Sequence, residues 1–308
     1  MTASERVMIT GASGFIGSHI VQFFLKKRIS VIAVDHREPG YNVPGTGGFK
    51  FLKTNLNRTT GTELIIRKYK PVCIIHHASN LVDVELSIRY PGKAFADIQM
   101  TVCLANLGRK YGMKHFIYAS SANVYGSPET EPITENFSVD PMSPYGITKA
   151  SVESFLTLFS VTYRIPCTIF RYFNVYGPHQ TLHTRAAIPS FVTGILKGRR
   201  IEVRGGDQTR DFVYVGDVAR ANYLAFRKKA GGIINIGGGK PISINSLVAL
   251  IAGMTGIKPD VNYIPRGSTD SVRSWADIKK AGKLLGWKPQ VSIERGMKKT
   301  IAYFRELA

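Results

Sequence analysis

Tyr145 and Lys149 are the side chains of this sequence best placed to carry out chemistry. They stand four residues apart in Tyr145-Gly-Ile-Thr-Lys149, within a segment that predicts a helix over Ser143–Tyr163. Residues at this spacing lie one turn apart on one helix face. A free tyrosine has a pKa of about 10, too high for a base at neutral pH, and nearby cations would lower it. Such a pair is also typical of an ordinary helix surface, so the neighbouring segments must decide between the two interpretations.

Ser121 is a third candidate. It follows the predicted strand Phe116–Ala119, in the segment Ala119-Ser-Ser-Ala-Asn-Val-Tyr-Gly126. Ligands of an open α/β sheet lie beyond the carboxyl ends of its strands, so the Ser121 hydroxyl could bond a substrate hydroxyl or carbonyl. The alternative is a turn hydroxyl that satisfies the local backbone.

A glycine-rich segment, Gly11-Ala-Ser-Gly14-Phe-Ile-Gly17, joins a predicted strand at Val7–Thr10 to a predicted helix at Phe15–Lys27. The first glycine permits a tight turn, the second lets the backbone approach a pyrophosphate, and the third lets helix and strand pack closely. The helix N-terminus offers free N–H groups and a favourable dipole. The segment predicts a dinucleotide site, with an ordinary tight turn as the alternative.

Asp35 ends the second predicted strand, Val31–Asp35, 18 residues after Gly17. An acidic side chain there binds ribose hydroxyls and repels a 2′-phosphate, which favours NAD over NADP. His36 and Arg37 weaken this preference, because a nearby arginine can accommodate the extra phosphate.

The elements that must position these residues alternate between strand and helix. This alternation predicts an α/β fold with a doubly wound parallel sheet and helices on both faces. The other segments expected in residues 1–173 are strands at Phe49–Leu52, Val72–His76 and Cys167–Phe170, a helix that ends at Leu64–Tyr69, and a helix at Ala94–Tyr111.

After Phe173 the rhythm loosens, which predicts a smaller α/β lobe over residues 174–308, with the possibility that the chain crosses between lobes more than once. Helices are expected near Ile188–Leu196, Val218–Phe226, Ser246–Met254, Ile278–Leu285 and Ile293–Phe304, and strands near Ile201–Val203, Phe212–Tyr214 and Ile233–Ile236.

The composition limits the class of protein. The chain has 308 residues, 44% of them hydrophobic, enough for a large core. We expect no signal peptide, and no apolar run reaches membrane-spanning length. Cys73, Cys103 and Cys167 lie far apart in apolar segments, as expected of free thiols in a reducing compartment, so the cytoplasm is predicted.

The net charge is +20, from 41 Lys and Arg against 21 Asp and Glu. Such a charge attracts anions, whether a nucleotide diphosphate, nucleic acid or an anionic membrane. The alternative is a solvated basic surface without a partner. The basic residues are dispersed and no nucleic-acid-binding motif accompanies them, so nucleic acid is not the expected partner.

The glycine pattern, Asp35, Ser121, Tyr145 and Lys149 occur in the order typical of the extended short-chain dehydrogenase/reductase family. The chain resembles that family over nearly its whole length. Later segments resemble sugar-nucleotide epimerases and dehydratases, UDP-glucose 4-epimerases above all. They are Arg171-Tyr-Phe-Asn-Val-Tyr-Gly-Pro178, Gln208-Thr-Arg-Asp-Phe-Val-Tyr214 with Asp217, and Ser274-Trp-Ala-Asp277 before Leu284-Leu-Gly-Trp287.

The resemblance implies a Rossmann-type fold, NAD as cofactor, a UDP-sugar as substrate, and a homodimer formed through the two long helices. It implies Tyr145 as the base, Lys149 as its partner and Ser121 as the hydroxyl partner. The cofactor residues it implies are Gly11, Gly14, Phe15, Ile16, Gly17, Asp35, Asn55, Leu56, Ala78, Tyr145, Lys149 and Tyr172. The substrate residues it implies, besides Ser121, are Asn174, Arg210, Arg266 and Asp270.

Ala122 and Asn123 narrow the reaction. Related dehydratases and decarboxylases carry acidic residues directly after the serine-equivalent hydroxyl, and neither alanine nor asparagine transfers protons. We therefore expect 4-epimerisation of a UDP-sugar, with a nucleotide-sugar reductase or dehydrogenase, or a non-catalytic binding protein, as alternatives. Ser274 aligns with a position that limits pocket size in related epimerases, which makes N-acetylated sugars plausible substrates.

Several residues depart from the family's usual pattern, which leaves the sugar open. They are Asn55, His77, Ser79, Leu81, Asp97 and Ala186. The histidines lack carboxylates at metal spacing, so no metal site is expected.

Overall fold

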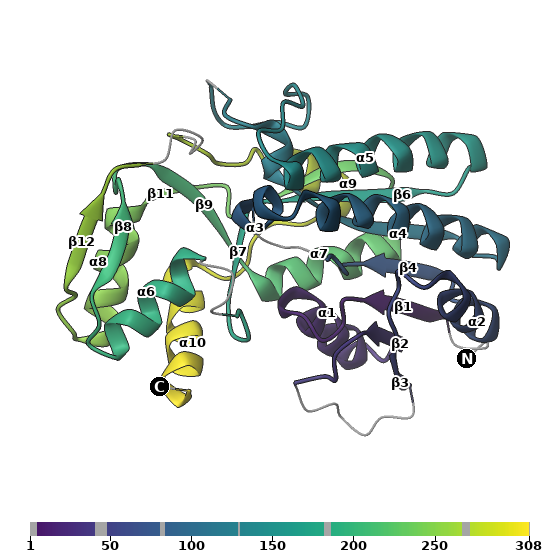
Figure 1. Cartoon of the computed structure of the whole chain (residues 1–308), viewed down its shortest axis with the longest axis horizontal. Coiled ribbons are helices and arrows are strands. Elements are labelled where there is room, and N and C mark those ends of the chain that lie inside the picture. The colour runs from purple at the N-terminus through teal and green to yellow at the C-terminus, as the bar shows by residue number, and fades with distance from the viewer. Residues whose placement is uncertain are drawn as a thin grey trace.

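The computed structural model describes residues 5–40, 48–80, 84–128, 130–181, 186–266 and 272–307. Its larger lobe is built on a seven-stranded sheet in the order β10-β6-β5-β4-β1-β2-β3, with parallel pairing throughout (Figure 1). Its strands are β1 Arg6–Thr10, β2 Ser30–Asp35, β3 Phe49–Lys53, β4 Cys73–His76, β5 His115–Ser121, β6 Cys167–Tyr172 and β10 Gly232–Ile236.

Helices cover both faces of this sheet, because its strands carry apolar side chains on both sides. The helices of one face are α1 Phe15–Lys26, α7 Val215–Lys228 and α9 Lys279–Leu285. The helices of the other face are α2 Thr59–Tyr69, α4 Pro91–Lys110 and α5 Pro144–Tyr163. The expected doubly wound parallel sheet is confirmed.

The smaller lobe contains short strands packed against three helices, around its own apolar core (Figure 1). Its strands are β7 Asn174–Tyr176, β8 Ile201–Arg204, β9 Thr209–Tyr214, β11 Pro241–Ser243 and β12 Val261–Ile264. Its helices are α6 Ala187–Leu196, α8 Ile244–Thr255 and α10 Ile293–Glu306. The strands of this lobe form a three-stranded sheet, β11-β9-β7, and a two-stranded sheet, β12-β8.

The chain crosses between the lobes more than once. After residue 173 it builds β7, β8 and β9, then returns with α7 and β10, and β10 pairs with β6 at the edge of the large sheet. Residues 174–308 thus also supply one strand and two helices of the larger lobe.

Two of the elements that were not predicted lie beside the candidate site. The helix α3, Val84–Arg89, precedes α4, which begins at Pro91 rather than near Ala94. A 3-10 helix, η1 at Ala122–Tyr125, follows β5 directly. Both are too short to show a helical period in the sequence.

Candidate active site

The turn between β1 and α1 has a backbone that side chains would obstruct. Gly11 has a φ of +67°, and a Cβ atom there would lie 2.7 Å from the carbonyl oxygen of His77. A Cβ atom at Gly17 would collide with the carbonyl oxygen of Gly11. The left-handed turn and the close helix–strand packing expected of this motif are therefore both present.

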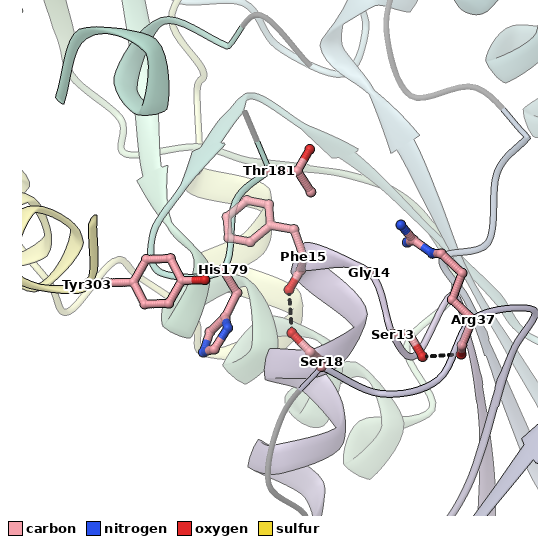
Figure 2. A pocket seen from close by; sticks show the side chains of 9 residues that line it. Ser13, Gly14, Phe15, Ser18, Arg37, His179, Thr181 and Tyr303 are labelled. Atoms are coloured by element: carbon pink, nitrogen blue, oxygen red, sulfur yellow. Dashed lines mark hydrogen bonds between the residues drawn. The ribbon is translucent and has the colours of Figure 1, made fainter. Parts of the chain in front are cut away.

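A cavity of about 180 Å³ opens at the N-terminus of α1 (Figure 2). Its lining includes Ser13, Gly14, Phe15, Arg37, His179 and Tyr303. Within the described part of the chain, no side chain caps the first N–H groups of α1, and the first turn holds no acidic residue. Free N–H groups and the positive end of a helix dipole suit an anion. This end of α1 therefore fits a dinucleotide pyrophosphate.

Asp35 lies buried at the end of β2, next to this cavity. Its two carboxylate oxygens accept hydrogen bonds from the backbone N–H groups of Ser13 and Arg37, both at 3.0 Å. Two exposed side chains approach the same carboxylate, the His36 imidazole at 3.2 Å and the Arg37 guanidinium at 3.9 Å. Asp35, which favours NAD, and Arg37, which can accommodate the 2′-phosphate of NADP, thus lie within one small cluster.

The first turns of α5 carry the tyrosine and the lysine. Ser143 caps the helix by accepting a hydrogen bond from the N–H of Gly146 at 3.1 Å, and Pro144 occupies the first position. The half-buried Tyr145 is tied to α3, because its N–H donates to the Ser87 hydroxyl at 3.2 Å. The buried Lys149 donates from Nζ to the carbonyl oxygen of Ala119 at 2.9 Å, and its Nζ lies 5.4 Å from the Tyr145 ring centre.

The pKa of Tyr145 differs from the expected direction. Burial raises it to about 12, and the hydrogen bond with Ser121 lowers it only in part. Burial also lowers the pKa of Lys149, although Asp97 and Glu153 act in the opposite direction. Since Lys149 bonds the Ala119 carbonyl, its cation alone does not bring Tyr145 into the range of a base at neutral pH.

Ser121 lies at the carboxyl end of β5 and is nearly buried. Its hydroxyl accepts hydrogen bonds from Asn123, from the backbone N–H at 3.2 Å and from Nδ2 at 3.1 Å. The Tyr145 phenol is a neighbour of Ser121, which lowers the pKa of that phenol. The structure thus brings Ser121, Tyr145 and Lys149 together at one end of the sheet.

A buried ion pair that was not predicted supports this arrangement. Glu153 of α5 accepts hydrogen bonds from the Arg171 guanidinium, the shortest at 2.6 Å, and from the Ser120 hydroxyl. The pair joins α5 to β5 and β6, the elements around the candidate site. The sequence holds a signal for it, because Tyr145, Lys149 and Glu153 follow one another at intervals of four and share one face of the helix.

Asp97 forms a second polar cluster beside the lysine. This buried carboxylate accepts hydrogen bonds from the Ser79 hydroxyl, from the N–H of Asn80 at 2.8 Å and from the Asn80 side chain at 2.6 Å. Burial raises its pKa, and the Lys149 cation lowers it. Asp97 and Ser79, two of the departures from the family pattern, thus form one connected unit.

The other residues expected at the cofactor lie around the same sheet edge. The Asn55 side chain accepts from the N–H of Asn57 at 3.0 Å, while Leu56 belongs to the apolar core. The N–H of Ala78 donates to the Thr10 hydroxyl at 3.3 Å. Tyr172 stacks on His77 and accepts a hydrogen bond from Asn222 at 2.8 Å, and Ile16 packs between the lobes.

The expected substrate residues lie in the smaller lobe and at its border. Asn174 on β7 donates to the carbonyl oxygen of Asp211 at 3.1 Å, and Arg210 lies on the adjoining strand β9. Arg266 follows β12, near Gly205 at the end of β8. Asp270 and Leu81 lie outside the described residues.

Among the described residues, no cluster of three His, Cys, Asp or Glu side chains could hold a metal ion. No helix in the described ranges is long and apolar enough to cross a membrane.

Known proteins with the same architecture are named after different UDP-sugars. Residues 7–237 match the model of the NAD dependent epimerase/dehydratase family. The UDP-glucuronate 4-epimerase of Thermodesulfobacterium geofontis is 32% identical, over 97% of this chain and 96% of the relative. The solved UDP-glucose 4-epimerase of Thermotoga maritima, with UDP-glucose, is 35% identical, with a TM-score of 0.92 over 98% of this chain and 99% of the other.

A second solved structure is the UDP-N-acetylglucosamine 4-epimerase of Methanobrevibacter ruminantium, in complex with UDP-N-acetylmuramic acid. It is 31% identical, with a TM-score of 0.92 over 99% of both chains. A family model that covers most of the chain, and relatives matched from end to end, agree with the site described above. The protein is a member of the NAD-dependent epimerase/dehydratase family, within the extended short-chain dehydrogenases/reductases.

Proposed function

We propose that this protein inverts the C4 centre of a UDP-sugar, with UDP-glucose, UDP-galactose or their N-acetyl forms as substrates. The observation that carries the proposal is the contact between Tyr145 and Ser121 beside Lys149, with an amide at Asn123 where a dehydratase would need an acid. A phenol and a hydroxyl can move and share one proton at the sugar oxygen, but this set offers no acid to expel water.

The chain's own residues would act in a fixed order. Tyr145 takes the proton of the C4 hydroxyl and later returns it, and Ser121 donates a hydrogen bond to the same oxygen. NAD, when bound, supplies the acceptor and then the donor of the C4 hydride. Lys149 orients the site and adds a positive charge that favours the phenolate form of Tyr145.

The arginines of the smaller lobe would hold the substrate by its diphosphate. Arg210 and Arg266 offer planar guanidinium groups suited to phosphate oxygens, and Asn174 offers an amide. We propose Asp270 as a ligand of the nucleoside ribose. Because these contacts grip the diphosphate and not the sugar, the ring would be free to turn as its 4-keto form.

We also propose that the enzyme acts in the cytoplasm as a homodimer. Cys73, Cys103 and Cys167 are free thiols, in keeping with a reducing compartment. The outer face of α5 exposes large apolar side chains, with Leu158 67% and Val161 75% exposed. An exposed apolar helix face of this kind is suited to pairing with a second copy.

One experiment separates the candidate functions. The purified protein is incubated with UDP-glucose, UDP-galactose, their N-acetyl forms and UDP-glucuronate, while NMR follows the sugars and absorbance follows NADH. Formation of the C4 epimer without accumulation of NADH is the expected result. A stoichiometric change in NADH would indicate a reductase or dehydrogenase instead. No turnover, together with tight, salt-sensitive binding of nucleic acid, would indicate a binding protein.

A further inference from the structure

The Ser121 hydroxyl has an unusually complete set of donors around it. A serine hydroxyl carries one proton and two acceptor lone pairs. Two N–H groups of one residue, the backbone N–H and Nδ2 of Asn123, point at this oxygen at 3.2 and 3.1 Å. With both acceptor positions used, the single proton of Ser121 is directed away from Asn123.

The base that neighbours this hydroxyl is Tyr145. Ser121 lowers the pKa of that phenol against the effect of burial. A hydrogen bond favours the phenolate only when the hydroxyl donates to it. A free serine hydroxyl can rotate and accept instead, and this second arrangement would stabilise the protonated phenol.

The backbone fixes Asn123 relative to Tyr145. Asn123 lies in η1, and its carbonyl oxygen packs on the first turn of α5, where a Cβ atom at position 146 would approach it to 2.8 Å. The next residue of η1 accepts a hydrogen bond from the N–H of Asp140 at 2.9 Å. The Asn123 side chain is itself exposed, so its amide bonds Ser121 at the open side of the site.

We propose that Asn123 is a positioning residue that holds the Ser121 hydroxyl as a donor, toward Tyr145 in the sugar-free protein and toward the reacting sugar oxygen when the sugar is bound. The identity of that sugar oxygen rests on the proposed function; the orientation of Ser121 toward Tyr145 does not. In this proposal Asn123 acts through its hydrogen bonds to Ser121, and not merely because position 123 carries no acid.

The test uses two variants of the NAD-loaded protein. Asn123→Leu keeps the approximate shape of the side chain and removes its donor without adding charge. Asn123→Asp keeps the shape and replaces the donor by a carboxylate that accepts the Ser121 proton. Tyr145 is titrated by tyrosinate absorbance, as the difference between each protein and the same protein carrying Tyr145→Phe.

We expect Asn123→Leu to raise the titration midpoint of Tyr145 by about half to one unit, the size of one neutral hydrogen bond. Asn123→Asp should raise it further, because it adds a negative charge. The acid limb of the kcat profile should move with the midpoint, kcat below it should fall about three- to tenfold, and KM should stay unchanged.

A double-mutant cycle supplies the matched control. When Ser121 is already Ala, adding Asn123→Leu should cause no further shift, since the side chain has lost the group that it positions. An unchanged midpoint in Asn123→Leu overturns the proposal, as does a shift of equal size without Ser121. A higher KM with the midpoint of the natural protein would also overturn it and assign Asn123 to direct sugar binding.

The titration needs no sugar, so the two proposals fail separately. A protein that converts no UDP-sugar would refute the proposed function, while the midpoints would still decide the role of Asn123. Melting curves show whether each variant is folded.

Discussion

The two ends of the polar face of α5 contain similar groups and differ in how far the protein satisfies them. Toward the middle of the helix, Glu153 and Arg171 are nearly buried and bond each other in more than one place. At the first turn, Tyr145 is half-buried, and Ser121 is the neighbour that lowers the pKa of its hydroxyl. Buried groups with full sets of partners hold elements together, whereas polar groups left open at a strand end can serve a substrate.

The largest effect should come from the open end. Tyr145→Phe removes the group that moves the proton and should lower the epimerisation rate by about 10²- to 10⁴-fold, the usual range for a general acid–base group. The melting temperature should change little, since the ring remains. NMR of the sugar products measures the rate. A variant that keeps its full rate would refute the proposed role of the tyrosine.

A change at the Glu153–Arg171 pair should lower the free energy of unfolding. Glu153→Gln leaves the Arg171 cation buried without its partner, and removing one member of a buried pair costs about 3–5 kcal/mol. Urea unfolding at pH 7 measures the loss. The double variant Glu153→Gln with Arg171→Met should recover part of it, because no unpaired charge then remains. If the single variant is as stable as the natural protein, the pair does not hold α5 to the sheet.

The two ends of β5 also differ: Ser121 at the carboxyl end lies in the candidate site, whereas the other end is part of the protein interior. Its first residue, His115, is buried, its Nε2 lies 2.8 Å from the Thr168 hydroxyl, and burial lowers its pKa to about 4. A histidine held neutral in the fold gives stability that is present above pH 6.5 and lost as pH falls toward 4, because the unfolded chain then binds more protons. At about 1.4 kcal/mol per pKa unit, the loss is up to about 3 kcal/mol.

His115→Gln should therefore make the fall in unfolding free energy between pH 6.5 and pH 4 smaller by the share that His115 contributes. Urea unfolding at several pH values measures both curves. Curves that run parallel would show that His115 does not titrate differently in the folded and unfolded chains.

The smallest effect is expected on the outer face of α5, opposite the site. Leu158→Lys places a charge in the proposed dimer contact and should raise the dimer dissociation constant about tenfold or more. Leu64→Lys, on the exposed face of α2, is the control and should leave the dimer intact. Light scattering over a dilution series follows the mass. A natural protein that is monomeric throughout would remove the dimer from the proposal.

Local patterns were sufficient to predict most of the elements of residues 1–173 and the three residues that we propose to be catalytic. The glycine turn, Asp35 and the pair Tyr145 and Lys149 are recognisable because each depends on spacing within one or two neighbouring elements. Ser121 was predicted because β5 ends there, and the carboxyl ends of parallel strands meet at one edge.

The remaining features of the fold and of the site depend on contacts between segments that are distant in the sequence. The strands β7 and β11 have three residues each, and their partner β9 lies well away in the sequence, so no period reveals them. A strand pattern at Ile233–Ile236 was predicted, but nothing local says that it joins β6. The raised pKa of Tyr145 follows from burial, which the sequence does not show.

The position of β10 at the edge of the large sheet has a consequence for synthesis of the chain. When the ribosome has synthesised the first 173 residues, six strands of that sheet have been made. The strand β10 and the helix α7, which packs beside α1, are still missing (Figure 1). The larger lobe cannot add α7 and β10 to its core until β7, α6, β8 and β9 of the smaller lobe have been synthesised. We therefore expect the two lobes to mature together during translation, and a fragment cut at residue 173 to expose apolar surface and aggregate.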